Sequence, residues 1–162
     1  MVPLYPNSSC EYNDVITDFG YQEWENSRLS YLSFNIDDLG NDLYNFFYEC
    51  PFSSIPESIG NLQFLEILKL QNQALITNFP QSLYTLINLT QLDCINCNVQ
   101  EINGMSNLTN MQNLSLNGNQ ITNIPENIGD LINLYNLDLY DNQLTSLPES
   151  IGDLINLYGN IS

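Results

Sequence analysis

Apolar and polar positions repeat in the C-terminal part of this chain with a period of 23 residues. MQNLSLNGNQITNIPENIGDLIN (111–133) is followed directly by LYNLDLYDNQLTSLPESIGDLIN (134–156), and both contain N-Q-[IL]-T-x-[IL]-P-E-x-I-G-D-L-I-N. Within the second copy, the apolar Leu137 and Leu139 alternate with polar neighbours, which is the period-2 pattern of a strand with one buried face. We therefore expect each unit to contain a short strand, a turn and a longer segment that returns on the opposite side.

Units of similar length continue towards the N-terminus with decreasing regularity. Leu29–Leu39 aligns with Leu144–Leu154, the segment that follows a strand, and this alignment predicts a degenerate unit with Phe19 and Trp24 inside. Residues before it form either a cap over the first unit or a loose tail. The predicted organisation is an irregular lead-in at 1–18 and a solenoid at 19–162, with units 19–41, 42–64, 65–88, 89–110, 111–133 and 134–156 and a partial unit at 157–162.

The L-x-x-L-x-L-x-x-N-x-L pattern, at a period of roughly 20–29 residues, resembles the leucine-rich repeat superfamily. The resemblance is clear from 51 to 157 and faint from 19. The L-P-x-x-I-G-x-L-x-x-L variant is similar to the cytosolic class, such as the plant Ras-group-related and Scribble-type repeat proteins. The resemblance implies an α/β fold, a curved right-handed β/α solenoid with a parallel sheet on its concave face, and binding through that face.

Fixed polar and special residues have structural roles in this pattern. Asn119 and Asn142 follow the strands at the ninth position, where a side-chain amide can satisfy backbone groups of the bend and of the neighbouring unit. Pro125 and Pro148 fix φ where the chain turns onto the convex side. These roles predict that much of the repeat consensus belongs to the scaffold.

The charge balance excludes several classes of partner. The chain has 19 acidic residues, two basic residues (Arg28 and Lys69), no His and a net charge of −17. Nucleic acid needs a Lys/Arg footprint, and an anionic membrane surface is disfavoured for the same reason. No apolar run is long enough for a membrane span. The charge either steers a protein partner with a basic surface towards this chain or simply keeps it soluble.

The N-terminal sequence MVPLYPNSSCEYND has neither a basic n-region nor an apolar h-region, so we expect a cytoplasmic protein. Cys94-x-x-Cys97 could be half of a zinc site or a redox pair. In the repeat register, however, Cys94 takes the inward sixth position. Cys97 takes the ninth position, which Asn119 and Asn142 occupy in the following units. We therefore predict structural cysteines, reduced in the cytoplasm, and no metal or cofactor.

Catalysis needs a base with a pKa near neutrality and a group that orients it. The chain has no His, and its acidic residues follow the repeat. Glu126, Asp130, Glu149 and Asp153 recur at the period and are expected on the solvated convex side. We therefore predict no enzymatic activity and no catalytic residues.

The concave strand positions are the candidate binding surface. The N-terminal predicted strand is aromatic and the C-terminal strand is polar and acidic, and exposed aromatics with polar neighbours are typical interface anchors. An alternative is that the N-terminal aromatics pack beneath the degenerate cap. The predicted partner-binding residues are Tyr44, Phe46, Tyr48, Lys69, Gln91, Asp93, Asn136, Asp138 and Tyr140.

The sequence thus predicts a non-enzymatic protein–protein interaction module that binds a partner through its concave face. The alternative is a regulatory or recognition fragment of a larger signalling protein, such as a kinase, a ubiquitin ligase or a receptor. Self-association through the C-terminal edge, Leu157–Ile161, is a third expectation, which sedimentation would test.

Overall fold

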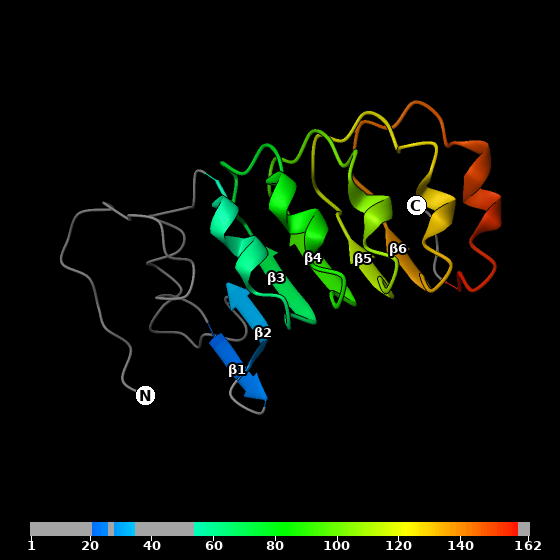
Figure 1. Ribbon diagram of the computed structural model, residues 1–162. Coiled ribbons are helices and arrows are strands. Elements are labelled where there is room, and N and C mark those ends of the chain that lie inside the picture. The colour runs from blue at the N-terminus through cyan, green and yellow to red at the C-terminus, as the bar shows by residue number, and fades with distance from the viewer. Residues whose placement is uncertain (1–20, 26–27, 35–53, 159–162) are drawn as a thin grey trace.

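The computed structural model describes residues 21–25, 28–34 and 54–158, and the chain folds as a stack of similar coils (Figure 1). One six-stranded sheet runs along the stack in the order β1-β2-β3-β4-β5-β6. The strands from β2 onwards are parallel, which confirms the predicted solenoid with a parallel sheet along one side. The strands are β1 (Tyr21–Glu25), β2 (Arg28–Phe34), β3 (Ile67–Gln71), β4 (Gln91–Ile95), β5 (Asn113–Ser115) and β6 (Asn136–Asp138).

Leucines at the fourth position of each unit set the register of the parallel strands. Leu68 pairs with Leu92, Leu92 with Leu114, and Leu114 with Leu137. All four leucines are buried. A slip of one residue would turn this row to solvent, so burial fixes which side chains face outwards.

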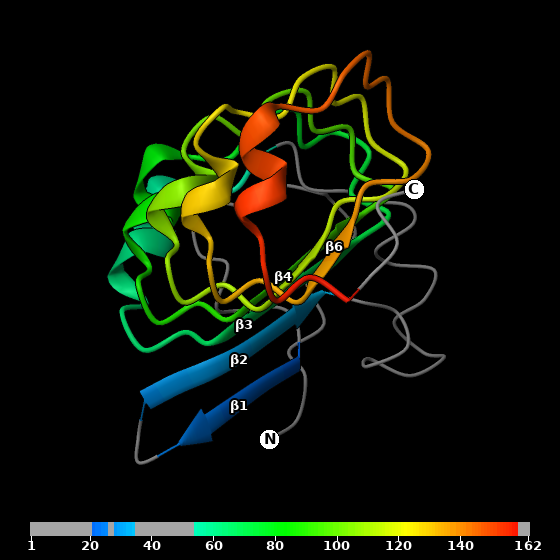
Figure 2. The same ribbon diagram turned by 90° about the vertical axis from the view of Figure 1, so that its right-hand side faces the viewer.

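The opposite side of the stack carries short 3-10 helices, which Figure 2 shows across the core from the strands. Pro125 and Pro148 precede two of them, and their carbonyl oxygens accept the first helical hydrogen bonds, from Ile128 and Ile151 at 3.0 and 3.1 Å. In the described residues these single turns take the place of the α-helices that a β/α solenoid implies. The 3-10 helices are η2 (Glu57–Asn61), η3 (Gln81–Thr85), η4 (Met105–Asn107), η5 (Ile128–Asp130) and η6 (Glu149–Asp153).

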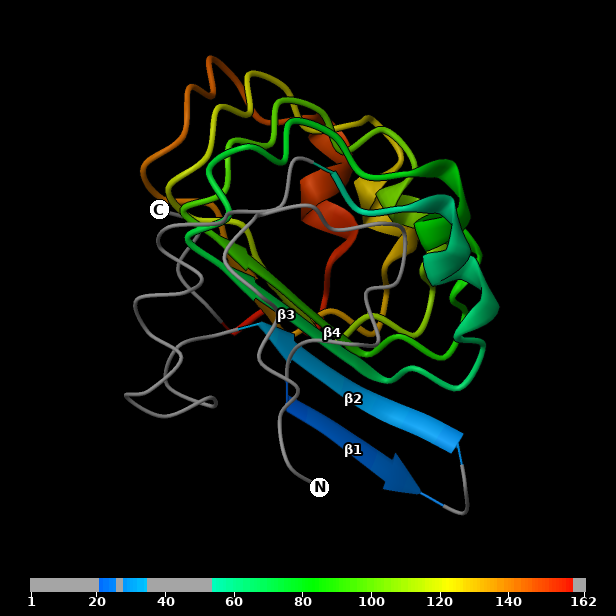
Figure 3. The same cartoon turned by 90° about the vertical axis from the view of Figure 1, so that its left-hand side faces the viewer.

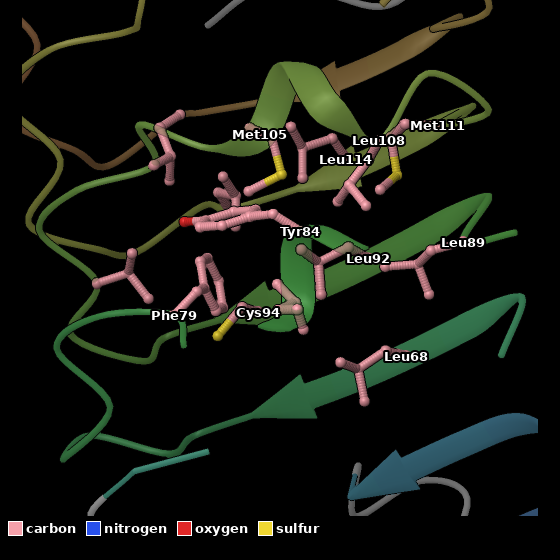
Figure 4. Close-up of a cluster of buried hydrophobic side chains, with 14 of the residues drawn as sticks. Leu68, Phe79, Tyr84, Leu89, Leu92, Cys94, Met105, Leu108, Met111 and Leu114 are labelled. Atoms are coloured by element: carbon pink, nitrogen blue, oxygen red, sulfur yellow. The ribbon is translucent and has the colours of Figure 1, made fainter. Parts of the chain in front are cut away.

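A continuous apolar core fills the space between the strands and the 3-10 helices. Figure 4 shows Leu68, Leu92 and Leu114 of the sheet together with Tyr84 of η3 and Met105 of η4. All five side chains are buried. Each layer covers the next, so a unit taken alone would expose the apolar residues on both of its faces.

Asn119 and Asn142 join adjacent units at the ends of the strands. The Asn119 Nδ2 donates to the carbonyl oxygens of Cys94, in the preceding unit, at 2.7 Å and of Leu116 at 2.8 Å. Its Oδ1 accepts from the Val99 N–H at 2.9 Å. Asn142 repeats the arrangement one unit later, with its Nδ2 2.9 Å from the Leu116 carbonyl oxygen. The predicted role of the ninth position is confirmed.

A second row of asparagines joins the units where one ends and the next begins. Each donates its side-chain amide to the carbonyl oxygen of the penultimate residue of the preceding unit. The donor–acceptor pairs, at 2.7–2.9 Å, are Asn88 with Gln63, Asn110 with Ile87, Asn133 with Thr109 and Asn156 with Ile132. The sequence signal for this row is the asparagine that ends both clean copies, but the period alone does not reveal what it contacts.

The N-terminal part of the sheet differs from the prediction. Arg28–Phe34, expected within the segment that follows a strand, is itself the strand β2 and pairs in parallel with β3. β1 pairs with β2 in antiparallel orientation and lies at the end of the sheet (Figure 3). The alignment of Leu29–Leu39 with Leu144–Leu154 is therefore wrong, because an antiparallel hairpin stands where a degenerate repeat was expected.

This error has an identifiable cause. Leu29, Leu32 and Phe34 have the L-x-x-L-x-L spacing of a strand segment, and the sheet pairs Leu32 with Leu68 and Phe34 with the next inward leucine. The same sequence also fits the segment that follows a strand, because the strand segment and the following segment of a unit both contain leucines three residues apart. Hydrogen bonding to β3 decides between the two alignments.

The 3-10 helices of adjacent units pack closely where one of the two contributes a glycine. Between η5 and η6 the earlier unit contributes the glycine, whereas between η3 and η4 the later unit does. A Cβ on Gly129 of η5 would lie 2.5 Å from the carbonyl oxygen of Ser150. Between η3 and η4, Tyr84 takes the position equivalent to that glycine, and the residue that faces it is Gly104. A Cβ on Gly104 would lie 2.3 Å from the Tyr84 Cδ2. The bulky ring is therefore accommodated only because its neighbour lacks a side chain.

Replacing Gly104 with Ala should cost about 1–3 kcal/mol, because the buried Tyr84 ring must move. Gly152→Ala is the matched control: a Cβ there meets nothing within 4 Å, so the change should be neutral or stabilising by up to about 1 kcal/mol. Urea denaturation followed by circular dichroism measures both. In a Tyr84→Ala background the cost of Gly104→Ala should fall, and an unchanged cost would contradict the proposed contact.

Burial raises the pKa of Tyr84 above its ordinary value. The folded chain therefore favours the neutral phenol, and this stability is present below the pKa of an unfolded tyrosine, about 10. It is lost as the pH rises through the higher pKa of the folded state. Between neutral pH and about pH 11 the free energy of unfolding should fall more in the wild type than in Tyr84→Phe, as urea titrations would measure. Equal losses in both proteins would refute the assignment.

Candidate functional site

The concave face is the side of the sheet turned away from the core, formed by the third, fifth and seventh positions of each unit. The strand pairing places these side chains in rows that cross the strands. One row is Ile67, Gln91, Asn113 and Asn136, and a second is Lys69, Asp93, Ser115 and Asp138. The side chains in both rows are half-buried. The structure thus brings Lys69, Gln91, Asp93, Asn136 and Asp138 onto one surface, as the alternation predicts.

Opposite charges occupy neighbouring strands in the central part of this face. Lys69 on β3 is the register partner of Asp93 on β4. Such a pair of opposite charges on neighbouring strands is favourable. The Gln91 Nε2 also donates to the Asp93 Oδ2 at 2.8 Å. The carboxylate of Asp93 is therefore held by contacts within the protein.

Tyr140 lies just after β6, and its side chain reaches back towards the preceding unit. The Asn117 Nδ2 donates to the Tyr140 Oη at 2.9 Å. The Tyr140 side chain nevertheless stays 49% exposed. Its phenol is thus oriented by a hydrogen bond while much of its surface is presented to solvent.

Tyr135 makes the same kind of contact at the other end of β6. The Asn113 Nδ2 donates to its Oη at 2.7 Å, and the side chain is 42% exposed. Sequence reasoning missed Tyr135 because it precedes the strand and lies outside the alternating outward positions. A signal was available, since the asparagine one unit earlier is at a strand position from which it can reach this residue.

Tyr44, Phe46 and Tyr48 were predicted to form the strand next to β3. In the described sheet, the strand that pairs with β3 on this side is β2. The three residues lie outside the part of the chain that the structure describes. The site residues with a described geometry are those on β3, β4 and β6 and Tyr140.

The family model described as "Domain of unknown function (DUF8346)" matches residues 27–153. The chain belongs to this family. No curated protein matches the sequence.

Solved structures similar to this DUF8346 chain are leucine-rich repeat proteins, which confirms the superfamily relationship. The leucine-rich repeat protein LIC12759 of Leptospira interrogans is 26% identical, with a TM-score of 0.55, over 70% of this chain and 34% of that one. The ectodomain of the receptor kinase SOBIR1 of Arabidopsis thaliana is 27% identical, with a TM-score of 0.59, over 67% of this chain and 61% of that one.

The Arabidopsis receptor kinase HAESA is similar to this DUF8346 chain over a smaller share of its own length. Its leucine-rich repeat ectodomain, solved with a peptide hormone ligand, is 34% identical with a TM-score of 0.57, over 64% of this chain and 18% of that one. The chain therefore spans less than two thirds of each of these three relatives.

The cysteines of the fourth unit occupy the predicted positions but not the predicted oxidation state. Cys94 and Cys97 are both buried. Cys94 lies in the core, and Cys97 lies at the ninth position, where Asn119 and Asn142 stand in the following units. They form a disulfide, which contradicts the expected reduced thiols. A bonded sulfur has no proton to donate, so the Leu70 and Ile95 carbonyl oxygens near Cys97 receive no hydrogen bond from it.

The described part of this DUF8346 chain has no cluster of three or more His, Cys, Asp or Glu side chains that could hold a metal ion. None of its helices is long and apolar enough to cross a bilayer, within the same residues. The pKa shift of Tyr84 belongs to the buried side of the stack. Among its described residues, the concave face presents the Lys69 ammonium, the Asp93 and Asp138 carboxylates and the Tyr140 phenol.

Alkylation of the denatured DUF8346 chain without reductant should leave Cys94 and Cys97 unmodified, and both should react once a reductant is added. Mass spectrometry of the peptide that contains both residues measures this directly. Because disulfides persist in oxidising compartments, the same result on protein trapped in cells would contradict the predicted cytoplasmic location. Full alkylation before reduction would restore the original expectation of free thiols.

Proposed function

We propose that this chain is a non-catalytic recognition module that binds a protein partner across its concave face. The observation that carries the proposal is the contrast between the two sides of the sheet. Inward positions repeat one residue type, as in Leu92, Leu114 and Leu137, whereas the outward row changes from Asp93 to Ser115 between adjacent strands. Packing explains the constant positions. It makes no demand on the outward positions, so these are free to match a partner.

The hydrogen bonds that orient two tyrosine side chains at this face support a role in binding. Tyr140 and Tyr135 are held by the amides of Asn117 and Asn113, and both remain partly exposed. A side chain that is already ordered loses little conformational entropy when a partner binds. Tyrosine is also enriched among residues that dominate interface energies.

The partner class follows from charge. The net charge of −17 favours encounter with a positively charged surface. The face carries two carboxylates, Asp93 and Asp138, against the single cation Lys69, among the described residues of its two rows. We therefore propose a protein partner that presents a basic segment.

The alternative function is a recognition segment of a larger signalling protein. The similarity to the HAESA ectodomain, solved with a peptide hormone ligand, favours it. Both proposals use the same binding face. They differ only in what is joined to the solenoid, which transcript sequencing would establish.

Affinity capture from the source cells tests the proposed face. A double variant, Asp93→Asn with Asp138→Asn, and the single variant Tyr140→Ala should each lose the partner that the wild type retains. The reason is that both changes remove contacts while leaving the core untouched. Quantitative mass spectrometry of the captured proteins measures the loss, and circular dichroism confirms that the stack is intact.

The matched control is Glu126→Gln with Asp130→Asn, which removes the same charge from exposed residues outside the concave rows. This control should capture the partner as the wild type does. If both double variants lose the partner equally, the loss is caused by the reduced net charge. If both retain it, neither pair of carboxylates is needed. Either result would contradict the proposed role of Asp93 and Asp138 in binding.

A further inference from the structure

The C-terminal end of the concave face contains the carboxylate of Asp138, whose Oδ1 accepts a hydrogen bond from the Tyr140 N–H at 3.5 Å. Two tyrosines oriented by hydrogen bonds flank Asp138 along the chain. Asp138 lies on β6, opposite Ser115 of β5. Tyr135 precedes the strand and Tyr140 follows it, and both phenols reach back to asparagines of the preceding unit. The tyrosines thus stand at the two ends of the strand, with the carboxylate between them along the chain.

The charge of Asp138 has no cation nearby within the described sheet. The chain has only two basic residues, Lys69 on β3 and Arg28 on β2. Lys69 is three strand steps from β6, about 14 Å at the usual spacing of about 4.8 Å. That distance exceeds the screening length of about 8 Å in physiological salt. Asp93, by contrast, has Lys69 as its register partner.

The hydroxyl groups of the two tyrosines retain a proton to donate. Each Oη accepts a hydrogen bond, from Asn113 at 2.7 Å or from Asn117 at 2.9 Å. A phenol both donates and accepts, so each hydroxyl proton is directed elsewhere. Two oriented donors near the ends of one strand suit the carbonyl oxygens of an extended peptide.

We propose that Asp138, Tyr135 and Tyr140 form a subsite for an arginine side chain of an extended peptide. The guanidinium is planar, forms strong hydrogen bonds with a carboxylate and packs against aromatic rings. An extended peptide places its side chains alternately, so one arginine can reach Asp138 while the adjacent backbone meets the phenols. This inference rests on the proposed function and names the chemistry that the face recognises.

Selection of short linear peptides from a displayed library, with the full chain as bait, tests the subsite. The selected peptides should be enriched in arginine. Replacing that arginine with citrulline, its neutral isostere, should weaken binding about tenfold or more by isothermal titration calorimetry. A library without arginine enrichment, or one that yields no binder, overturns the inference.

Variants of the chain test whether the arginine of the peptide binds at Asp138. Asp138→Asn should weaken binding of the arginine peptide about tenfold, and it should have little further effect on the citrulline peptide, because the pair is already broken. Asp130→Asn removes the same charge from an exposed residue outside the concave rows and should change the affinity less than about twofold. Equal effects of the two variants would overturn the subsite.

The same titrations distinguish this inference from the proposed function. Peptides that are insensitive to Asp138→Asn but lose affinity with Tyr140→Ala or Asp93→Asn would refute the arginine subsite alone. Peptides that bind every concave variant as they bind the wild type would refute the concave face as well. Tyr140→Phe separates the ring from its hydroxyl and should retain most of the cation–aromatic contact.

Discussion

The surface of this solenoid depends on the hydrogen bonds that join each unit to the next. Asn119 and Asn142 satisfy buried backbone groups at the ends of the strands, and the asparagines that close each unit satisfy carbonyl oxygens of the preceding one. A buried carbonyl left unpaired costs about 1–3 kcal/mol, so the amides of Asn119 and Asn142 are needed at the ends of the strands. These two rows hold both ends of the repeat in register. The outward side chains can therefore form straight rows across the sheet.

The regular part of the fold was predictable because its causes are periodic. Leu137 is buried because the strand alternates, and Asn142 is at the ninth position because every bend needs the same amide. β2 escaped prediction because its register partner lies farther away in the chain: Leu32 pairs with Leu68, whereas Leu68 pairs with Leu92. A search at a fixed period finds copies of one length only. Residues added between two strands do not prevent the strands from pairing, since the sheet responds to hydrogen bonding and burial rather than to spacing.

Irregular features are concentrated around the fourth unit, 89–110. It lacks the proline that opens the 3-10 helix in its neighbours, and Gly104 gives room to the Tyr84 ring of the preceding unit. Cys97 takes the ninth position, where the following units have asparagine, and, in the disulfide, donates no hydrogen bond. Two of these departures are offset locally: Gly104 leaves space for the Tyr84 ring, and a covalent bond stands where the hydrogen bonds of the asparagine are missing. The sequence shows each departure, but the contact between Gly104 and the Tyr84 ring joins two units and becomes visible only in the stack.

Tyr135, Asp138 and Tyr140 lie in the regular units 111–156, and their geometry depends on that regularity. The Tyr140 hydroxyl can meet Asn117, and the Tyr135 hydroxyl can meet Asn113, because β5 and β6 are in parallel register along their whole length. A slip of one residue would move both phenols away from their amides and turn Asp138 towards the core. The proposed arginine subsite therefore belongs to the most constant part of the scaffold. A repeated backbone also fixes the side chains that it does not need for packing, such as Tyr135 and Tyr140.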